Sequence, residues 1–343
     1  MCMKRRTVWI MLLLISCVYA CSKDAVDMFT GFQQPVNFPV AVYHFNSNPV
    51  TKDGFELGRK LFYDPVLSAN NTISCGSCHV QTASFTHNGH SVSHGIFDRL
   101  GTRNSPPVMN LAWSTSFMWD GGIFDLDLQP IAPVTNHVEM DDSVENVLAR
   151  LRSSSVYPGL FKKAFGTDEI NSARFLKALS QFMVMCVSSN AKYDSVMRNQ
   201  SAFTTVEKEG YAIFKQKCNR CHTEPLFTDY SFRNNGLAPS LVNDNGRYSI
   251  TLNNKDRYKF KVPSLRNLSY TPPYMHDGRF FTLDAVLDHY TGQVKNTPNL
   301  DSILQQNNRL GIDISAAEKI KLLAFLETLN DKVFVRDKRF AEQ

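Results

Sequence analysis

Residues 75–79 of this chain read Cys-Gly-Ser-Cys-His, and residues 218–222 read Cys-Asn-Arg-Cys-His. Each run is a C-x-x-C-H motif, the signature of c-type haem attachment. Two cysteines three positions apart lie on one side of a helical turn, so both sulfurs reach one porphyrin while the next histidine binds its iron. The predicted haem ligands are Cys75, Cys78 and His79 for the first haem, and Cys218, Cys221 and His222 for the second. We therefore expect two covalently bound c-type haems.

A zinc site built from the four motif cysteines is the alternative interpretation. It gives the two trailing histidines no role, and the motifs start far apart, at positions 75 and 218. The chain has eight cysteines, and those outside the motifs are Cys2, Cys17, Cys21 and Cys186. Cys186 lies in an apolar run, which predicts a buried small side chain and no disulfide framework.

The composition is typical of a packed globular protein with about two domains. The chain has 343 residues, of which 43% are hydrophobic and 20% are charged, and domains usually contain roughly 100–200 residues. Its net charge of +5 is mild and is raised by a basic run at residues 4–6. The sequence has no dense stripe of Lys and Arg, so we expect no nucleic-acid partner.

Residues 1–20 have the pattern of an export signal. The basic run at residues 4–6 precedes an apolar run that is too short to span a bilayer. Residues 18–21, Val-Tyr-Ala-Cys, resemble a bacterial lipobox, and residues 14–17, Leu-Ile-Ser-Cys, are the competing site. We expect a periplasm-facing protein with a lipid anchor at Cys21, and an ordinary cleaved signal is the alternative. Either interpretation suits c-type haem, which is attached after export.

Helical periodicity recurs along the chain. The predicted helices cover residues 55–62, 143–153, 171–189, 204–217 and 315–329. Thr204 and Glu207 have the spacing of a capping box at the start of the fourth helix. In the last helix, the expected core face consists of Ile320, Leu322, Leu323, Phe325 and Leu326. These patterns predict an all-α fold with long loops.

An internal repeat divides the chain into two related parts. Asn110 is followed ten residues later by Asp120, and Asn267 is followed at the same interval by Asp277. This pattern predicts two tandem cytochrome c-like domains with one c-type haem each. The expected divisions are a lipoprotein-type signal peptide over residues 1–20, a tether over 21–45, an N-terminal domain over 46–190 and a C-terminal domain over 191–343.

The order of the remaining motifs is specific. Thr-Arg-Asn-Ser-Pro at residues 102–106, Phe-Met-Trp-Asp-Gly at 117–121 and Glu-Met at 139–140 follow the first C-x-x-C-H run. Lys-Val-Pro-Ser-Leu-Arg-Asn at 261–267 and Pro-Tyr-Met-His-Asp-Gly-Arg-Phe at 273–280 follow the second. In this order, which extends over residues 46–329, the chain resembles the bacterial dihaem cytochrome c peroxidase family, including its MauG-like branch.

The resemblance implies a peroxide-reactive first haem and a second haem through which electrons enter. It assigns Glu139 to proton transfer between the two peroxide oxygens, with Gln129 as a second distal residue. Trp119 matches the tryptophan between the two haems and would relay electrons. The alternatives are a surface carboxylate for Glu139 and a core aromatic residue for Trp119. His137 stands where the family usually has proline.

The sixth ligands of the two irons are less well defined by the resemblance. His90 and His94 are candidates for a reversible ligand of the first iron, and each is also consistent with a solvated loop histidine. Tyr290 stands where the peroxidase branch has methionine and the MauG-like branch has tyrosine. A tyrosine ligand would lower the potential of the second haem. Core packing is the alternative for Tyr290, and Met275 would then be the ligand.

The resemblance also implies a calcium ion between the domains and a homodimer. Asn104 and the backbone carbonyls of Lys261 and Pro263 match the calcium ligands. The implied function is reduction of hydrogen peroxide with electrons from a small c-type cytochrome or a similar donor. A MauG-like enzyme that oxidises residues of a partner protein is one alternative. A dihaem electron carrier with both irons six-coordinate is another.

Overall fold

The computed structural model describes residues 29–239, 242–306 and 308–343. Residue contacts divide the chain into residues 1–31 and residues 32–343. The second unit contains both C-x-x-C-H motifs, and the description below concerns this unit. The predicted domain boundaries are not resolved by this division and stay predictions.

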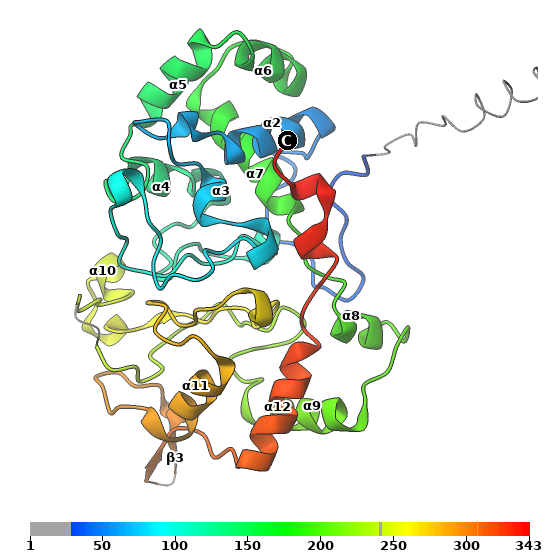
Figure 1. The fold of residues 1–343 in the computed structure, drawn as a ribbon, viewed down its shortest axis with the longest axis vertical. Helices are drawn as coiled ribbons and strands as arrows, with labels where there is room; N and C mark the ends of the chain where they lie inside the picture. Colours follow the sequence, from blue (N-terminus) through cyan, green and yellow to red (C-terminus); the bar gives the residue numbers. More distant parts are fainter. Residues whose placement is uncertain (1–28, 240–241, 307) are drawn as a thin grey trace, which may run out of the picture. The chain divides into compact units, whose positions relative to one another are not determined.

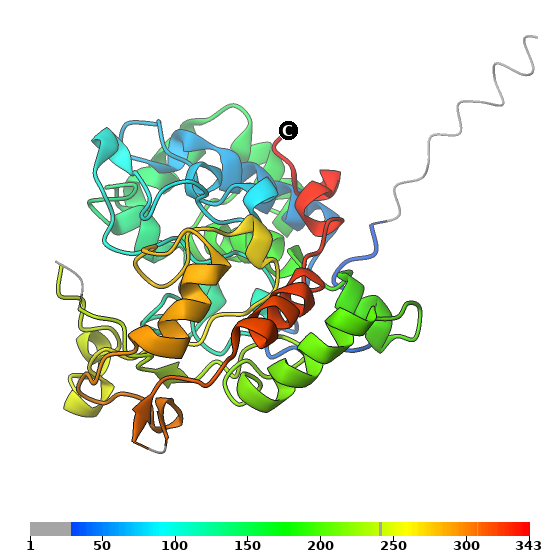
Figure 2. The same ribbon diagram turned by 60° about the horizontal axis from the view of Figure 1, so that its bottom comes forward.

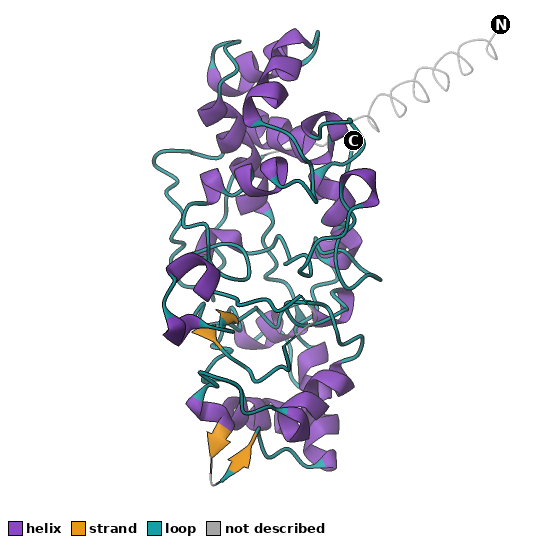
Figure 3. Ribbon diagram, turned by 90° about the vertical axis from the view of Figure 1, so that its left-hand side faces the viewer, coloured by secondary structure: helices purple, strands orange, loops and turns teal. Residues whose placement is uncertain are grey.

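The helices within residues 32–343 form two groups (Figure 1). The helices of the first group are α2 Lys52–Tyr63, α3 Cys75–Cys78, α4 Ile131–Thr135, α5 Val144–Ser153, α6 Tyr157–Phe165 and α7 Ser172–Met185. Those of the second are α8 Lys192–Met197, α9 Thr205–Lys217, α10 Tyr248–Thr251, α11 Leu283–Asp288 and α12 Ala316–Glu327. Figure 3 shows loop segments running through the middle of the unit, between helices at its two ends. The first haem motif forms the short helix α3, the second begins at the C-cap of α9, and each is followed by a loop segment.

Four two-residue strands are the only strands in the described part of the chain. β1 Phe232–Arg233 pairs antiparallel with β2 Phe260–Lys261, and β3 Gln305–Gln306 pairs antiparallel with β4 Arg309–Leu310. No larger sheet forms among these residues. The prediction of a mostly helical fold is confirmed.

All five predicted helices are present, and a polar side chain caps the start of each. The capping residues, each accepting a hydrogen bond from a backbone N–H in the first turn, are Thr51, Ser143, Asn171, Thr204 and Ser315. Thr204 forms the predicted capping box with Glu207. The helix predicted for 171–189 ends earlier, at Met185, because Cys186 has a non-helical backbone with ψ 71°. Cys186 is fully buried, as predicted.

The predicted core face of α12 was wrong at one position. Ile320 is 68% exposed, whereas Leu322, Phe325 and Leu326 are buried. Ile320 precedes Leu322 by two residues, which corresponds to about 200° around a helix, and so it lies on the opposite face. The buried face packs against α9, and Figure 2 shows the two helices side by side. The rings of Phe325 and Phe214 on α9 lie 5.1 Å apart.

The internal repeat is visible in the backbone. Asn110 and Asn267 both adopt the left-handed conformation immediately before a 3-10 turn. Met118 and Met275 also have positive φ angles, of 66° and 75°. Isolated β-bridges close the two corresponding loops, at Phe117–Ile123 and at Tyr274–Phe280. The two parts of the chain thus share an unusual local backbone as well as a sequence pattern.

Polar contacts join the two helix groups. The chain returns to α2 after α12, where Arg59 Nη1 donates to the Arg339 carbonyl at 2.7 Å. Between the loops, Arg103 forms ion pairs with Asp120 at 2.5 Å and with Asp244 at 2.6 Å. Arg103 belongs to the Thr-Arg-Asn-Ser-Pro motif, so this motif fixes the first part of the chain to the second.

A buried ion pair holds the loop that follows β2. Arg266 and Asp194 are both fully buried, and their side chains form two hydrogen bonds of 2.8 Å. Arg266 also donates to the Pro225 carbonyl at 2.7 Å. A buried charge without its partner is strongly destabilising, so this pair keeps residues 261–267 against the second haem motif.

The predicted signal segment, residues 1–20, lies outside the described residues, together with Cys17 and Cys21. Among the residues that are described, no helix combines the length and the apolar character needed to cross a membrane. Export and lipid anchoring therefore stay predictions.

Candidate haem sites

The first C-x-x-C-H motif forms α3 and the residue after it. His79 Nδ1 lies 2.7 Å from the carbonyl oxygen of Phe85, which leaves Nε2 available for an iron ion. Phe85 has a left-handed backbone, with φ 59°, and this conformation turns its carbonyl toward the motif. Burial lowers the pKa of His79 and raises the pKa of both Cys75 and Cys78.

Glu139 lies beside the first motif, in the loop after α4. Its side chain is half-buried, and Oε1 accepts a hydrogen bond of 2.7 Å from Asn136 Nδ2. Burial raises the pKa of Glu139. Burial is the main cause of the raised pKa of Cys75 and of Cys78, and the negative charge of Glu139 adds a smaller contribution to both. The partly buried carboxylate is therefore close to the predicted haem attachment, and its assignment to proton transfer stays a prediction.

Trp119 links the first part of the chain to the second motif. Its Nε1 donates to the Asn104 carbonyl at 2.7 Å, and its own carbonyl accepts from Lys261 N at 2.7 Å. Trp119 also lines the cavity at the second motif. Met118 directly precedes Trp119, and its Sδ lies 3.9 Å from Gln129 Nε2. The structure thus fixes Trp119 at the cavity of the second motif, and its role as an electron relay stays a prediction.

The second C-x-x-C-H motif begins at the C-cap of α9. His222 Nδ1 lies 3.2 Å from the Phe227 carbonyl and 3.2 Å from the Pro263 carbonyl. The motif opens on a cavity of ≈ 220 Å³. Its apolar lining includes Leu265, Leu268, Leu287 and Leu322. As at the first motif, the histidine is oriented by backbone carbonyls and keeps Nε2 for a metal.

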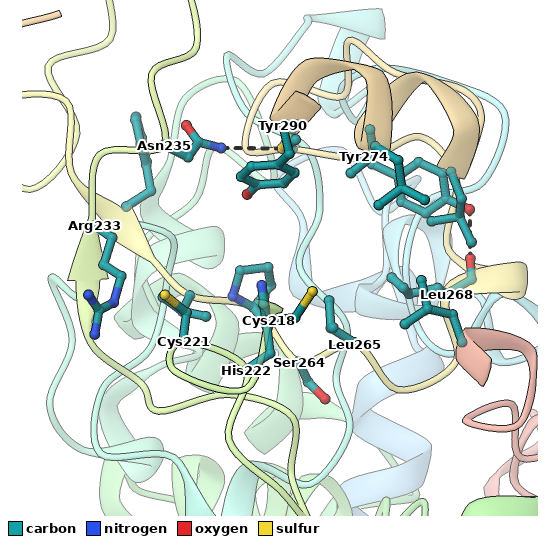
Figure 4. Close-up of a pocket in the computed structure, with 18 of the residues that line it drawn as sticks. Cys218, Cys221, His222, Arg233, Asn235, Ser264, Leu265, Leu268, Tyr274 and Tyr290 are labelled. Carbon is teal, nitrogen blue, oxygen red and sulfur yellow. Dashed lines mark hydrogen bonds between the residues drawn. The ribbon is translucent and has the colours of Figure 1, made fainter. Parts of the chain in front are cut away.

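Tyr290 lies across this cavity from His222 (Figure 4). It belongs to a π-helical turn, His289–Gln293, that directly follows α11. Burial raises the pKa of Tyr290 to about 12, and the nearby Asn235 side chain opposes that rise. Met275 lines the same cavity, and its Sδ lies 3.5 Å from Asn235 Nδ2. Both predicted ligands of the second iron are therefore at one site.

Three histidines cluster in the loop after the first motif. The ring centroids of His87, His90 and His94 lie 4.8 to 6.3 Å apart. His94 Nδ1 lies 2.5 Å from Asp98 Oδ1, and the His94 carbonyl lies 3.8 Å from Cys78 Sγ. His94 is thus next to the first motif through its backbone, while His90 is exposed. No group of three His, Cys, Asp or Glu side chains within the described ranges is arranged to hold a metal ion by itself.

The three residues predicted to bind calcium line the cavity at the second motif. Asn104 Nδ2 donates to the Ser91 carbonyl at 3.1 Å, and the Pro263 carbonyl faces His222. Lys261 Nζ donates to the Ser116 carbonyl at 2.6 Å, and burial lowers its pKa to about 8. The structure brings these residues together at the meeting of the two parts, and calcium itself stays a prediction.

The residues at the second motif fit a haem. Figure 4 shows Cys218, Cys221 and His222 on one side of the cavity and Tyr290 on the other. A flat macrocycle between two axial groups needs this arrangement, with thiols at its edge and apolar walls around it. At the first motif the same histidine geometry is present, and a carboxylate, Glu139, is the nearby acid–base group.

Sequence reasoning missed the carbonyls of Phe85 and Phe227 and the side chain of Asn235. Phe85 and Phe227 have φ angles of 59° and 57°, and residue type gives no signal for this, because phenylalanine rarely adopts such a backbone. Asn235 did have a signal. It lies in an Asn-Asn-Gly turn whose Gly236 has φ 70°.

Comparisons with known proteins identify the family of this chain. The family model described as di-haem cytochrome c peroxidase matches residues 52–202. Methylamine utilization protein MauG of Methylorubrum extorquens is 36% identical over 320 residues, covering 90% of this chain and 86% of that protein. Cytochrome c551 peroxidase of Nitrosomonas europaea is 35% identical over 286 residues, covering 82% of this chain and 81% of that protein.

Solved structures give the same result. A MauG-like protein associated with microbial copper homeostasis has 30% identity and a TM-score of 0.80, covering 91% of this chain and 98% of that structure. The diheme peroxidase BthA of Burkholderia thailandensis has 20% identity and a TM-score of 0.75, covering 86% of this chain and 91% of that structure, so it supports the fold alone. With both haem motifs in place and these relatives covering most of its length, the chain belongs to the di-haem cytochrome c peroxidase family.

Proposed function

We propose that this chain reduces hydrogen peroxide, H₂O₂ + 2 e⁻ + 2 H⁺ → 2 H₂O, at a covalently attached c-type haem on Cys75, Cys78 and His79. The haem supplies the redox chemistry when it is bound. One observation carries the proposal, namely the difference between the two sites. A half-buried carboxylate with a raised pKa, Glu139, lies at the first motif, whereas a potential axial ligand, Tyr290, faces the second.

Glu139 moves the proton in this proposal. Its carboxylate accepts a proton from one peroxide oxygen and returns it to the other as the O–O bond breaks. Burial raises the pKa of Glu139, which brings its acidity closer to what proton return requires. The hydrogen bond from Asn136 holds the carboxylate in place during both steps. Gln129 would act as a second polar group near the peroxide.

Electrons would enter at the second haem, on Cys218, Cys221 and His222. Trp119 lines that cavity and is held at both its indole nitrogen and its carbonyl. A fixed, oxidisable indole between two redox centres suits electron transfer in single steps. A small c-type cytochrome or a similar redox protein would be the donor.

A second candidate is a MauG-like reaction, in which peroxide drives oxidation of residues on a partner protein. Tyr290 favours it, because the structure places a tyrosine and not a methionine across the cavity from His222. Two curated relatives carry the name MauG, at 36% and 32% identity. Electrons would then leave the partner protein and pass through Trp119.

Other features of the cellular setting are also proposals. We propose that the protein faces the periplasm with a lipid at Cys21, and that it forms a homodimer. A calcium ion between Asn104 and the carbonyls of Lys261 and Pro263 would brace the two parts of the chain, because oxygen ligands suit this ion.

Peroxide consumption by the haem-loaded protein tests the function. With a reduced small c-type cytochrome as donor, we expect two donor molecules to be oxidised for each peroxide consumed. Consumption of peroxide without donor, accompanied by oxidised residues on an added partner protein, would favour the second candidate. No consumption above that of free haem would overturn both candidates and leave an electron carrier.

A further inference from the structure

Asn235 lies between the two side chains that compete for the second iron. Its Nδ2 is 3.5 Å from Met275 Sδ, and its side chain lies beside Tyr290 in the cavity (Figure 4). Figure 4 shows the amide nitrogen of Asn235 directed into the space beside the Tyr290 ring. Met275, Tyr290 and His222 all line one cavity. The inference that follows rests on the proposed haem at His222.

The orientation of the Asn235 amide is set by its own turn. Asn235 Oδ1 accepts a hydrogen bond of 3.4 Å from Leu237 N. This donor identifies the amide oxygen, so the nitrogen must point the other way, into the cavity. The side chain therefore presents a donor, and not an acceptor, to Met275 and Tyr290.

The backbone around Asn235 is tied to the segment that follows Tyr290. The Asn235 carbonyl lies 3.0 Å from His289 Nε2, and the Gly236 carbonyl accepts from Lys295 N at 2.8 Å. Gly236 has φ 70°, and a Cβ at this position would lie 2.6 Å from Val294 Cγ1. The turn thus packs too closely for a side chain at Gly236. Asn235 and Tyr290 are held in a fixed relation to each other.

We propose that Asn235 selects Tyr290 over Met275 as the sixth ligand of the second haem. Its N–H engages the thioether sulfur, so that Met275 is held away from the iron. With Met275 held by this donor, Tyr290 is the side chain left to face the iron from across the cavity. Asn235 is therefore a positioning residue that sets the potential of the second haem through its choice of ligand.

The first part of the chain shows a related contact. Met118, the repeat counterpart of Met275, lies 3.9 Å from the amide nitrogen of Gln129. Both methionines have a left-handed backbone. The two amides come from different places in their repeats, so the contact does not follow from the repeat itself. In both parts the repeated methionine faces an amide nitrogen.

Spectra and potentials of the haem-loaded Asn235→Leu variant test this proposal. Leucine has a similar size and cannot donate a hydrogen bond. We expect the near-infrared charge-transfer band of methionine-ligated ferric haem to appear, together with a higher midpoint potential of the second haem. Loss of this neutral hydrogen bond corresponds to a shift of about twofold to tenfold in the ligand equilibrium. Adding Met275→Leu should remove the new band.

Two further variants make every outcome decisive. Should Asn235→Leu fail to take up haem, Asn235→Asp keeps the turn to Leu237 and replaces the donor by an acceptor, with the same expected changes. A wild-type spectrum and potential in Asn235→Asp or Asn235→Leu would overturn the proposal. An unchanged second-haem spectrum in Tyr290→Phe would show that Tyr290 is not the ligand, which also overturns it. Peroxide consumption by the wild type reports separately on the proposed function.

Discussion

Replacing Glu139 with glutamine isolates the proton-transfer role of this residue. Glutamine keeps the shape of the side chain, and its Oε1 can still accept the 2.7 Å hydrogen bond from Asn136. Burial raises the pKa of Glu139, so a neutral side chain at this position removes a desolvated charge and should not destabilise the fold. Any loss of rate in Glu139→Gln is therefore expected to arise from the missing proton acceptor.

The expected loss is a factor of about 10² to 10⁴, the usual contribution of a positioned general acid or base. This factor corresponds to about 2.7 to 5.4 kcal/mol in the activation free energy. Stopped-flow mixing of the haem-loaded protein with hydrogen peroxide, followed at the haem absorption bands, measures the rate. Glu145→Gln is the matched control, because Glu145 lies in the first turn of α5 with 76% of its side chain exposed. A Glu139→Gln rate within about twofold of the wild type would refute the assigned role.

Three further predictions address electron transfer, stability and pH. Trp119→Phe should slow electron exchange between the haems and leave both haem spectra unchanged. The control Trp113→Phe, at a buried tryptophan bonded to a loop carbonyl, should leave the exchange rate unchanged, and pulse reduction measures that rate in both variants. Asp194→Asn should lower the unfolding free energy by about 3–5 kcal/mol, because it leaves Arg266 buried without its charged partner. A decrease of under about 1 kcal/mol in a denaturant titration would contradict this prediction. Burial raises the pKa of Glu139 above its ordinary value of 4.5, so the native state binds more protons at this residue than the unfolded state does. This contribution to stability is complete below pH 4.5 and is lost as pH rises through the raised pKa. The difference in unfolding free energy between wild type and Glu139→Gln should therefore change over that pH window, and a constant difference would contradict the prediction.

The helices were predictable because their signals are local. Thr204 and Glu207 form a capping box that any reading of the sequence detects, and the structure has it. Ile320 shows where local reasoning fails. A run of apolar residues does not say which of them faces the neighbouring helix, and Ile320 is exposed although its neighbours are apolar. Counting the helical angle from Leu322 corrects the error.

The haem sites were predictable as far as their covalent chemistry reaches. The motifs identified His79 and His222 by spacing alone, whereas the carbonyl of Phe85 that orients His79 depends on a left-handed backbone that phenylalanine seldom adopts. Asn235 contacts Met275 and lies beside Tyr290 only because separate loops meet at the cavity. Spacing along a chain carries no information about such a meeting.

Electron paramagnetic resonance of the haem-loaded protein tests the difference between the two sites most directly. In the ferric protein, or after reduction by one electron, we expect one high-spin and one low-spin haem, and hydrogen peroxide should remove the high-spin signal first. Two low-spin signals that do not respond to peroxide in either state, or a single haem per chain, would contradict the proposed division of roles between Glu139 and Tyr290.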